Sequence, residues 1–249
     1  MAGHSKWAQI KHKKAVTDAR RGKLFTKLAR AITVAAREGG GDPDGNATLA
    51  TAIQKARDYS MPKDNIERAI AKGTGEGAEG AEIEAVTYEG YGPGGAALLV
   101  ETLTDNRNRT GAEIRHAFEK HNGSLGEPGS VAWIFEKRGV LLVDAERYDE
   151  DDLIAAIDAG ADDVAVDGDS LKVLCAPADL GAVRSALENG GVQIQSSELT
   201  MEPQNVVEVD GNNAGTLIRL MEVLDEHDDV DSVHANFDVP AAVLEQAAA

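Results

Sequence analysis

The stretch GVLLVDAERYDEDDLIAAIDAGADDVAVDGDSLKVLCAPADLGAVRSALENGGVQIQSSELTM, residues 139–201, decides the fold class of this chain. It alternates apolar, strand-like runs with two helical segments, one with acids in its first turn and one with Pro near its start and Gly after its end. The turn Asp167-Gly168-Asp169 predicts a hairpin. The expected strands are 139–145, 162–168, 170–176 and 192–201, and the expected helices are 149–160 and 177–190. This order, β-α-β-β-α-β, is the ferredoxin-like arrangement.

Strand-like and helical segments on both sides of this stretch predict a second α/β domain. Those before it are strands 84–91 and 96–103, a helix over 110–120, and SVAWIF (130–135), a buried strand or an anchoring turn. Those after it are a strand at 205–211, a helix over 213–227 and a strand at 229–239. The later elements lack partners of their own, so we expect them to pair with the earlier strands. Residues 82–135 plus 204–241 would then form a middle domain interrupted by an inserted domain, 136–203.

Residues 1–75 have helical patterns only. Helices are expected over 18–37, 47–58 and 62–73, each ended by glycine or turn residues, and the Gly-rich segment 74–82 predicts a linker. The predicted fold class is therefore α+β, with an N-terminal three-helix domain followed by two ferredoxin-like α/β domains, the last inserted into the middle one.

Positive charge is concentrated at one end of an acidic chain. Residues 1–37 contain ten Lys or Arg and one Asp, whereas the whole chain carries a net charge of −18. Such segregation indicates a polyanionic partner for that end. A transit peptide or a solvated basic helix face is the alternative, although apolar residues in 18–37 recur as in an amphipathic helix that packs on a core. Trp7 among these cations could stack on an unpaired base or anchor the segment.

The loop TDNRNRT (104–110) is a second candidate region. Asp105, Asn106 or Thr110 can cap the helix that follows, whereas Arg107 and Arg109 are not needed for capping and could contact phosphate or pair with acids. The predicted nucleic-acid-binding residues are Lys6, Trp7, Lys11, His12, Lys13, Lys14, Arg20, Arg21, Lys23, Lys27, Arg30, Arg107 and Arg109.

Sequence signals for catalysis, metals and cofactors are weak. The six histidines have no zinc-site spacing, and the glycines of YEGYGPGG (88–95) precede a strand-like run, which favours a tight hairpin over a phosphate loop. Aspartates such as Asp162, Asp228 and Asp229 fall at helix starts and turns, where solvated acids are expected. We therefore expect no catalytic residues, metal, cofactor or small-molecule substrate. The single Cys175 and the lack of a run of about 20 apolar residues predict a cytoplasmic protein without a membrane partner.

Seven motifs resemble those of the YebC family. They are MAGHSKW (1–7), IKHKK (10–14), D-x-x-R-G-K-L-F-T-K-L (18–28), MPKDNIERAI (61–70), YEGYGPGG (88–95), LTDNRNRT (103–110) and GSVAWIFEKRG (129–139). The resemblance implies a cytoplasmic protein with a helical domain and two α/β domains, one interrupted by the other. Family members are commonly described as DNA-binding transcriptional regulators, and organellar and some bacterial relatives as translation activators at the ribosome. No enzyme activity is associated with the family.

The favoured hypothesis is a non-enzymatic, nucleic-acid-binding regulator of gene expression, by resemblance a DNA-binding transcriptional regulator. The alternative is a ribosome-associated translation factor that binds ribosomal RNA or tRNA. The predicted helix 62–73 carries only Lys63, Arg68 and Lys72 as cations, too few for a convincing base-reading helix. Loops with glycine and arginine suit irregular RNA better. An enzyme that uses the loops of residues 88–110 is the third hypothesis.

Overall fold

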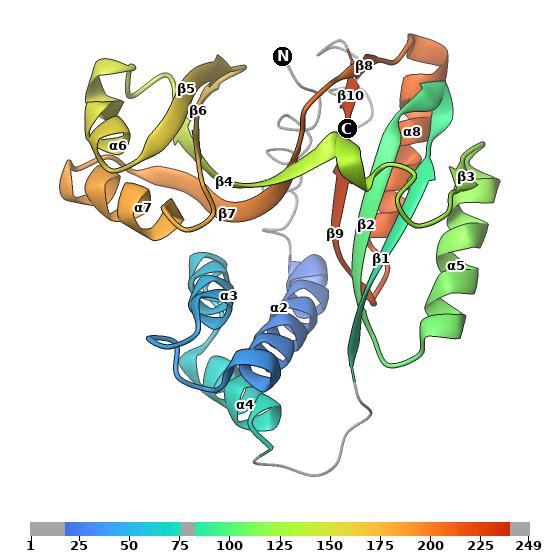
Figure 1. Ribbon diagram of the computed structural model, residues 1–249, viewed down its shortest axis with the longest axis horizontal. Helices are drawn as coiled ribbons and strands as arrows, with labels where there is room; N and C mark the ends of the chain where they lie inside the picture. The colour runs from blue at the N-terminus through green and yellow to red at the C-terminus, as the bar shows by residue number, and fades with distance from the viewer. Residues whose placement is uncertain (1–17, 76–82, 240–249) are drawn as a thin grey trace.

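The computed structural model describes residues 18–75 and 83–239, with backbone only for residues 18–21. Figure 1 shows three lobes: a helical lobe below, and two lobes above it that each contain a β-sheet. The fold is α+β, which confirms the class predicted from the sequence. No helix among the described residues is long and apolar enough to cross a membrane.

The helical lobe consists of α2 (Asp18–Gly39), α3 (Ala47–Asp58) and α4 (Lys63–Gly73). Asn46 caps α3, because its side-chain oxygen accepts a hydrogen bond of 3.0 Å from the amide of Leu49. The core is formed by apolar residues of all three helices: Leu28, Ile32, Leu49, Ile53, Ala56 and Ile66. Gly73 allows α4 to approach α2 closely, since a Cβ there would lie 2.4 Å from the carbonyl oxygen of Thr33.

The right-hand lobe of Figure 1 is the middle sheet with its two helices. Its elements before the inserted part are β1 (Glu84–Tyr91), η1 (Pro93–Gly95), β2 (Ala97–Thr104), α5 (Arg107–Lys120) and β3 (Ser124–Leu125). Those after it are β8 (Val207–Glu208), α8 (Gly211–Asp225), β9 (Val230–Ala235) and β10 (Phe237–Asp238). The sheet order is β3-β1-β2-β9, so its strands come from both sides of residues 135–203. Residues of α5 and α8, among them Phe118 and Leu217, share one core with Leu98 and Val100 of β2.

The left-hand lobe contains residues 139–201, for which the ferredoxin-like order was predicted. Its elements are β4 (Phe135–Asp144), η3 (Asp151–Leu153), α6 (Ile154–Asp158), β5 (Ala161–Asp167), β6 (Ser170–Cys175), α7 (Leu180–Asn189) and β7 (Ile194–Pro203). The sheet order β5-β6-β4-β7 is antiparallel throughout, as in a ferredoxin-like domain.

Some element boundaries differ from those expected. The helix expected over 149–160 is a 3-10 turn plus five α-helical residues, because carboxylates of Asp149 and Asp152 accept backbone hydrogen bonds that hold a turn at its start. Strand β4 begins at Phe135 rather than 139, because β7 supplies pairing partners as far as Pro203. SVAWIF forms an anchoring turn, η2 (Ala132–Ile134), that leads into β4. The two-residue strand β3 was not expected.

Candidate nucleic-acid interface

The structure describes only part of the predicted interface. Lys6, Trp7, Lys11, His12, Lys13 and Lys14 lie outside the described residues, and Arg20 and Arg21 are described by backbone alone. The side chains of Lys23, Lys27, Arg30, Arg107 and Arg109 are described. They lie on two elements, α2 and the start of α5, and the loop between α8 and β9 connects them.

Lys23 and Lys27 of α2 reach the C-terminal end of α8. Lys27 donates a hydrogen bond to the carbonyl oxygen of Asp225, the last residue of that helix. Lys23 lies 3.5 Å from the carbonyl oxygen of Glu226 and 3.7 Å from the carboxylate of Asp228. The carbonyls that end a helix carry partial negative charge, so cations are favourable there. Two residues of the predicted phosphate-binding stripe therefore already contact groups of the middle lobe.

Arg30, one helical turn further along α2, links the two lobes more tightly. Its Nη1 donates to the carbonyl oxygens of Leu103 at 2.8 Å and Asp228 at 3.1 Å. It also lies 2.7 Å from Oδ1 of Asp229, whose side chain is only 4% exposed. Asp229, expected from the sequence to be a solvated turn acid, is in fact a buried partner of a guanidinium.

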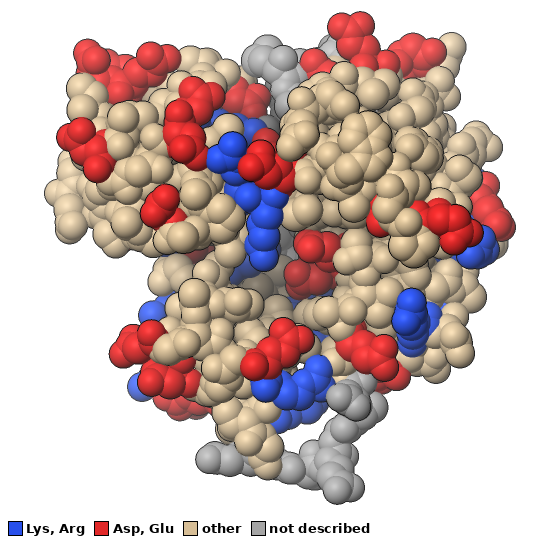
Figure 2. All heavy atoms as spheres, in the orientation of Figure 1, with Lys and Arg blue, Asp and Glu red and all other residues tan. Residues whose placement is uncertain are grey.

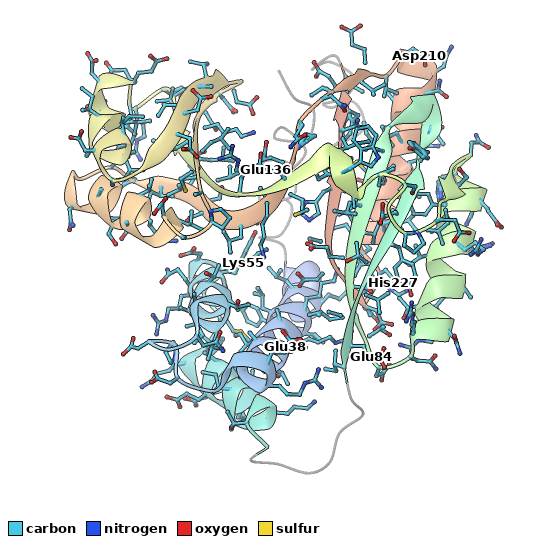
Figure 3. The ribbon with its side chains drawn as sticks, viewed as in Figure 1. Glu38, Lys55, Glu84, Glu136, Asp210 and His227 are labelled. Carbon is cyan, nitrogen blue, oxygen red and sulfur yellow. The ribbon has the colours of Figure 1, made fainter. Side chains whose placement is uncertain are left out.

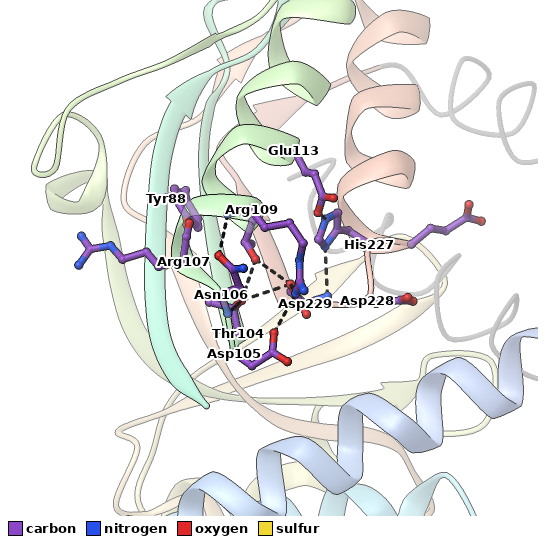
Figure 4. A network of polar contacts seen from close by, with 12 residues as sticks. Tyr88, Thr104, Asp105, Asn106, Arg107, Arg109, Glu113, His227, Asp228 and Asp229 are labelled. Carbon is purple, nitrogen blue, oxygen red and sulfur yellow. Dashed lines mark hydrogen bonds and ion pairs between the residues drawn. The ribbon is translucent and has the colours of Figure 1, made fainter. Parts of the chain in front are cut away.

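Asp229 is the centre of a polar network (Figure 4). Its Oδ2 accepts hydrogen bonds from Arg109 at 2.6 Å, from the Thr110 hydroxyl at 2.6 Å and from the Thr104 hydroxyl at 3.2 Å. Burial alone would raise the pKa of this carboxyl, but the bonds from Thr110, Arg109 and Arg30 outweigh it and hold the pKa well below its usual range. Asp229 therefore stays ionised and fixes the start of α5 against α2.

The two arginines of the 104–110 loop have different surroundings. Arg109 bridges Asp105, at 2.9 Å, and Asp229, so it makes the ion pairs that were one of its two expected roles. Asn106 caps α5, since its side-chain oxygen accepts from the amide of Arg109 at 3.0 Å. The Arg107 side chain is exposed and points away from the network in Figure 4. Arg107 is thus the residue of this loop that can reach a phosphate without breaking a described contact.

Glu113, His227 and Asp229 place three potential metal ligands within 4.8 Å of one another. The backbone amide of Asp229 donates a hydrogen bond to Nδ1 of His227 at 3.1 Å. The ring proton is therefore on Nε2 of His227, and this nitrogen donates to the Glu113 carboxylate at 2.8 Å. Both oxygens of Asp229 already accept bonds from arginines. These groups fit a hydrogen-bond network that orders the α8–β9 loop better than a metal site.

A second set of ion pairs joins the helical lobe to the left-hand lobe. Arg184 of α7 makes two bonds of 2.9 Å to the two carboxylate oxygens of Asp58 at the end of α3. Lys55, which is labelled in Figure 3 at the top of α3, lies 3.3 Å from Glu198 of β7. The Glu198 charge raises the pKa of Lys55 above its usual range. Sequence reasoning missed these residues, because each pair unites positions more than a hundred residues apart.

Ser232, His234 and Glu101 lie close together in the middle sheet, and this group bears on the enzyme hypothesis. Nε2 of His234 lies 3.0 Å from Glu101 and 3.1 Å from the Ser232 hydroxyl, and Nδ1 lies 3.2 Å from Thr200 of β7. A serine relay needs the hydroxyl and the carboxylate on opposite ring nitrogens. Here Glu101 and the Ser232 hydroxyl contact the same nitrogen, so Ser232 is not placed as the nucleophile of such a relay. The Thr200 hydroxyl contacts the other nitrogen but is buried, 8% exposed, where the group links the two sheets.

Surface charge is uneven in the view of Figure 2. Acidic side chains are spread over all three lobes, and Lys and Arg side chains are seen in the cleft between the two upper lobes, over β4 and near Glu136, as well as on the helical and right-hand lobes. Strand β4 carries Lys137, which is exposed, and Arg138, which pairs with Glu136 and Asp162. Positive charge is therefore present at this cleft as well as on α2.

Comparison with known proteins places the whole chain. Residues 5–76 match the TACO1/YebC protein N-terminal domain, and residues 83–237 match the TACO1/YebC second and third domain. A "probable transcriptional regulatory protein" of Rubrobacter xylanophilus is 54% identical over 249 residues, 100% of both chains. A protein of the same name from Halothermothrix orenii is 53% identical over 250 residues, 99% of this chain and 98% of the relative.

A solved structure has the same fold. The crystal structure of a conserved hypothetical protein from Aquifex aeolicus matches with a TM-score of 0.84 and 47% sequence identity, and the match covers 94% of this chain and 97% of that one. The motifs, the two family matches and the full-length relatives agree. This chain belongs to the TACO1/YebC family.

Proposed function

We propose that this protein is a non-enzymatic regulator of gene expression that binds nucleic acid through the basic residues before α2 and at its start. The observation that carries the proposal is the concentration of ten Lys or Arg in residues 1–37 of a chain with a net charge of −18. Lys and Arg side chains bind phosphates with release of counterions, whereas the acidic lobes repel phosphates. Nucleic acid should therefore bind preferentially at the basic surface. The names of the full-length relatives support a role in transcription. The free, buried Cys175 suits the reducing cytoplasm.

Binding to ribosomal RNA or tRNA during translation is the second candidate, and one observation favours it. Two of the three cations of α4 are engaged within that helix: Lys63 lies 3.4 Å from Glu67, and Arg68 bonds to Asn65 and the carbonyl of Asp64. A helix that reads bases in the major groove needs several side chains aimed at base edges. The described helical lobe therefore suits contacts with a nucleic-acid backbone and irregular shapes.

Charge reversal at the N-terminal segment tests the proposal. Replacing Lys11, Lys13 and Lys14 by Glu should lower affinity for both duplex DNA and structured RNA by at least about tenfold and flatten the salt dependence, because roughly one counterion is released per phosphate contact. The matched control reverses Lys63, Lys72 and Lys120, which changes net charge equally at other surfaces. Equal affinity losses in the two triple variants would show a nonspecific charge effect and contradict the assignment.

Cross-linking in cells, with sequencing of the bound nucleic acid, separates the two candidates. Enrichment of promoter DNA supports the transcriptional role, whereas enrichment of ribosomal RNA or tRNA, together with co-sedimentation with ribosomes, supports the translational one.

The enzyme hypothesis rests on the 88–110 loops, where Arg109 is held by Asp105 and Asp229. If a turnover depended on these loops, substitution of Arg107 and Arg109 by Ala would abolish it and leave nucleic-acid affinity intact, whereas phosphate binding by Arg107 predicts a loss of nucleic-acid affinity instead.

A further inference from the structure

Trp133 is the most exposed large hydrophobic side chain in the described part of the chain, with 66% of its surface accessible. It lies in the turn η2. The residues on either side of it in the sequence, Val131, Ile134 and Phe135, are buried against Ala97 and Leu99 of β2. The turn thus anchors itself through the residues around Trp133. The indole is not among the side chains that form this core, so packing of the core does not require a tryptophan at this position.

The polar groups of two aromatic side chains meet at one oxygen. Nε1 of Trp133 and the hydroxyl of Tyr91 both donate to the carbonyl oxygen of Ser130, each at 3.1 Å. Tyr91 is 39% exposed. Because both donors are satisfied within the protein, the two rings are held near each other and neither needs a further polar partner. Their apolar surfaces remain accessible to solvent.

A buried carboxylate fixes the loop that presents these rings. Glu89, 8% exposed, accepts backbone hydrogen bonds from Gly129 at 2.7 Å, Val131 at 2.7 Å and Ala132 at 2.8 Å. Burial opposes ionisation of Glu89, but the three amides outweigh it and lower its pKa. Burial of a charge is unfavourable without such partners. The loop is therefore preorganised, which reduces the entropy lost when a ligand binds to it.

Exposed positive charge on the strand that follows the turn indicates what the rings bind. The turn η2 runs directly into β4, where Lys137 is exposed only four residues after Trp133, and Figure 2 shows Lys and Arg side chains in the cleft that β4 crosses. A nucleotide offers both a flat base for aromatic stacking and an anionic phosphate for a cation. A proline-rich peptide would use the rings but gain little from the lysine.

We propose that Trp133 and Tyr91 form a stacking platform for an unpaired base of single-stranded nucleic acid, with the adjacent phosphate towards Lys137. The bases of an intact duplex are stacked on each other, so the platform selects single-stranded segments, loops or ends. This inference rests on the proposed nucleic-acid binding and adds a site on the α/β lobes, remote in sequence from α2.

Fluorescence of Trp133 tests the platform. The chain has two tryptophans, so Trp7→Phe leaves Trp133 as the sole reporter. In this parent, a single-stranded oligonucleotide should quench the emission, and an abasic sugar-phosphate strand of equal length should bind without quenching. Trp133→Ala in the same parent should weaken oligonucleotide binding roughly tenfold, the effect of losing one stacked base. The salt dependence should stay the same, because no phosphate contact is lost.

Two controls make the result decisive. Val223→Ala shortens another exposed apolar side chain, on α8, and should leave binding unchanged. Trp133→Phe keeps an aromatic face and should retain most of the affinity. Unchanged affinity in Trp133→Ala, or quenching by a proline-rich peptide and not by the oligonucleotide, would overturn the platform. If the parent binds the oligonucleotide and only the Trp133 result is negative, the proposed function survives. The affinity of the Trp7→Phe parent is compared with that of wild type first, and a wild-type protein that binds no nucleic acid overturns both.

Discussion

The helical lobe contacts each of the other two lobes through an interface of charged side chains, here called a joint, and the two joints differ in how deeply these charges are buried. Its joint with the middle lobe centres on Asp229, a carboxylate that is 4% exposed and bonded to Arg30, Arg109 and two threonines. Its joint with the left-hand lobe consists of Asp58–Arg184 and Lys55–Glu198, whose side chains are 18–34% exposed. A buried charge that loses a partner is left without solvent, whereas a surface charge regains water. The first joint should therefore behave as part of the core, and the second as an adjustable contact.

Asp229→Asn should have the largest effect on stability. The substitution removes the buried charge that accepts from Arg30, Arg109 and two buried threonine hydroxyls, while the guanidiniums, 23% and 45% exposed, regain water. Loss of hydrogen bonds to a charged acceptor should cost about 2–3 kcal/mol. Urea unfolding followed by circular dichroism measures the change. The matched control is Asp228→Asn, because Asp228 is the neighbouring residue and its side chain is 75% exposed. Equal destabilisation by the two variants would contradict the central role of Asp229.

The pH dependence of stability gives the same joint a second signature. The pKa of Asp229 in the folded state lies below its ordinary value of 3.8, so the unfolded chain binds the proton first as pH falls. Its stabilising contribution is complete above about pH 5 and is lost progressively as the pH falls below that value. The wild-type unfolding midpoint should fall more steeply between pH 5 and pH 3 than that of Asp229→Asn.

The fold was readable from the sequence because its signals are local. Turn residues such as Asp167-Gly168-Asp169 and the apolar strand runs around them lie within one short segment, and the ferredoxin-like order follows from reading them in turn. The start of β4 at Phe135 was missed because it depends on pairing with Pro203, a partner remote in the chain. Local chemistry thus predicts the elements, and long-range pairing sets their ends.

The polar network around Asp229, in contrast, could not be predicted from local sequence. Sequence position marks Asp229 as a turn residue, and its donors come from residues 30, 104, 109 and 110, which only the folded chain brings together. Likewise, the basic pattern of α2 predicts a phosphate-binding stripe but cannot indicate that Arg30 is held by the α8–β9 loop. The contribution of the segment before α2 to nucleic-acid binding stays a prediction.

Arg184→Ala should affect the second joint less. The pair with Asp58 is bidentate but partly solvated, so its removal should destabilise the protein by about 1 kcal/mol. A double-mutant cycle with Asp58→Ala isolates the pair from the bond of Arg184 to Glu188 on its own helix. The coupling energy should shrink at high salt. A coupling as large as the Asp229→Asn effect would remove the distinction between the two joints.

Glu101→Gln should have the smallest effect on the free energy of unfolding. It tests whether burial of a carboxylate, rather than the size of its pKa shift, determines how much its contacts stabilise the protein. A hydrogen bond from His234 lowers the pKa of Glu101 to about 2, and through His234 the carboxylate is linked to Thr200 of β7. Because the folded-state pKa is depressed, the contribution is present above about pH 4.3 and is lost as pH falls towards 2. Its side chain is, however, 44% exposed, so water compensates for most of what the bond provides. The loss at pH 7 should be below about 1 kcal/mol, measured by urea unfolding, despite the large pKa shift. A loss near that of Asp229→Asn would mean that the link between the two sheets, and not only the buried joint at Asp229, holds the lobes together.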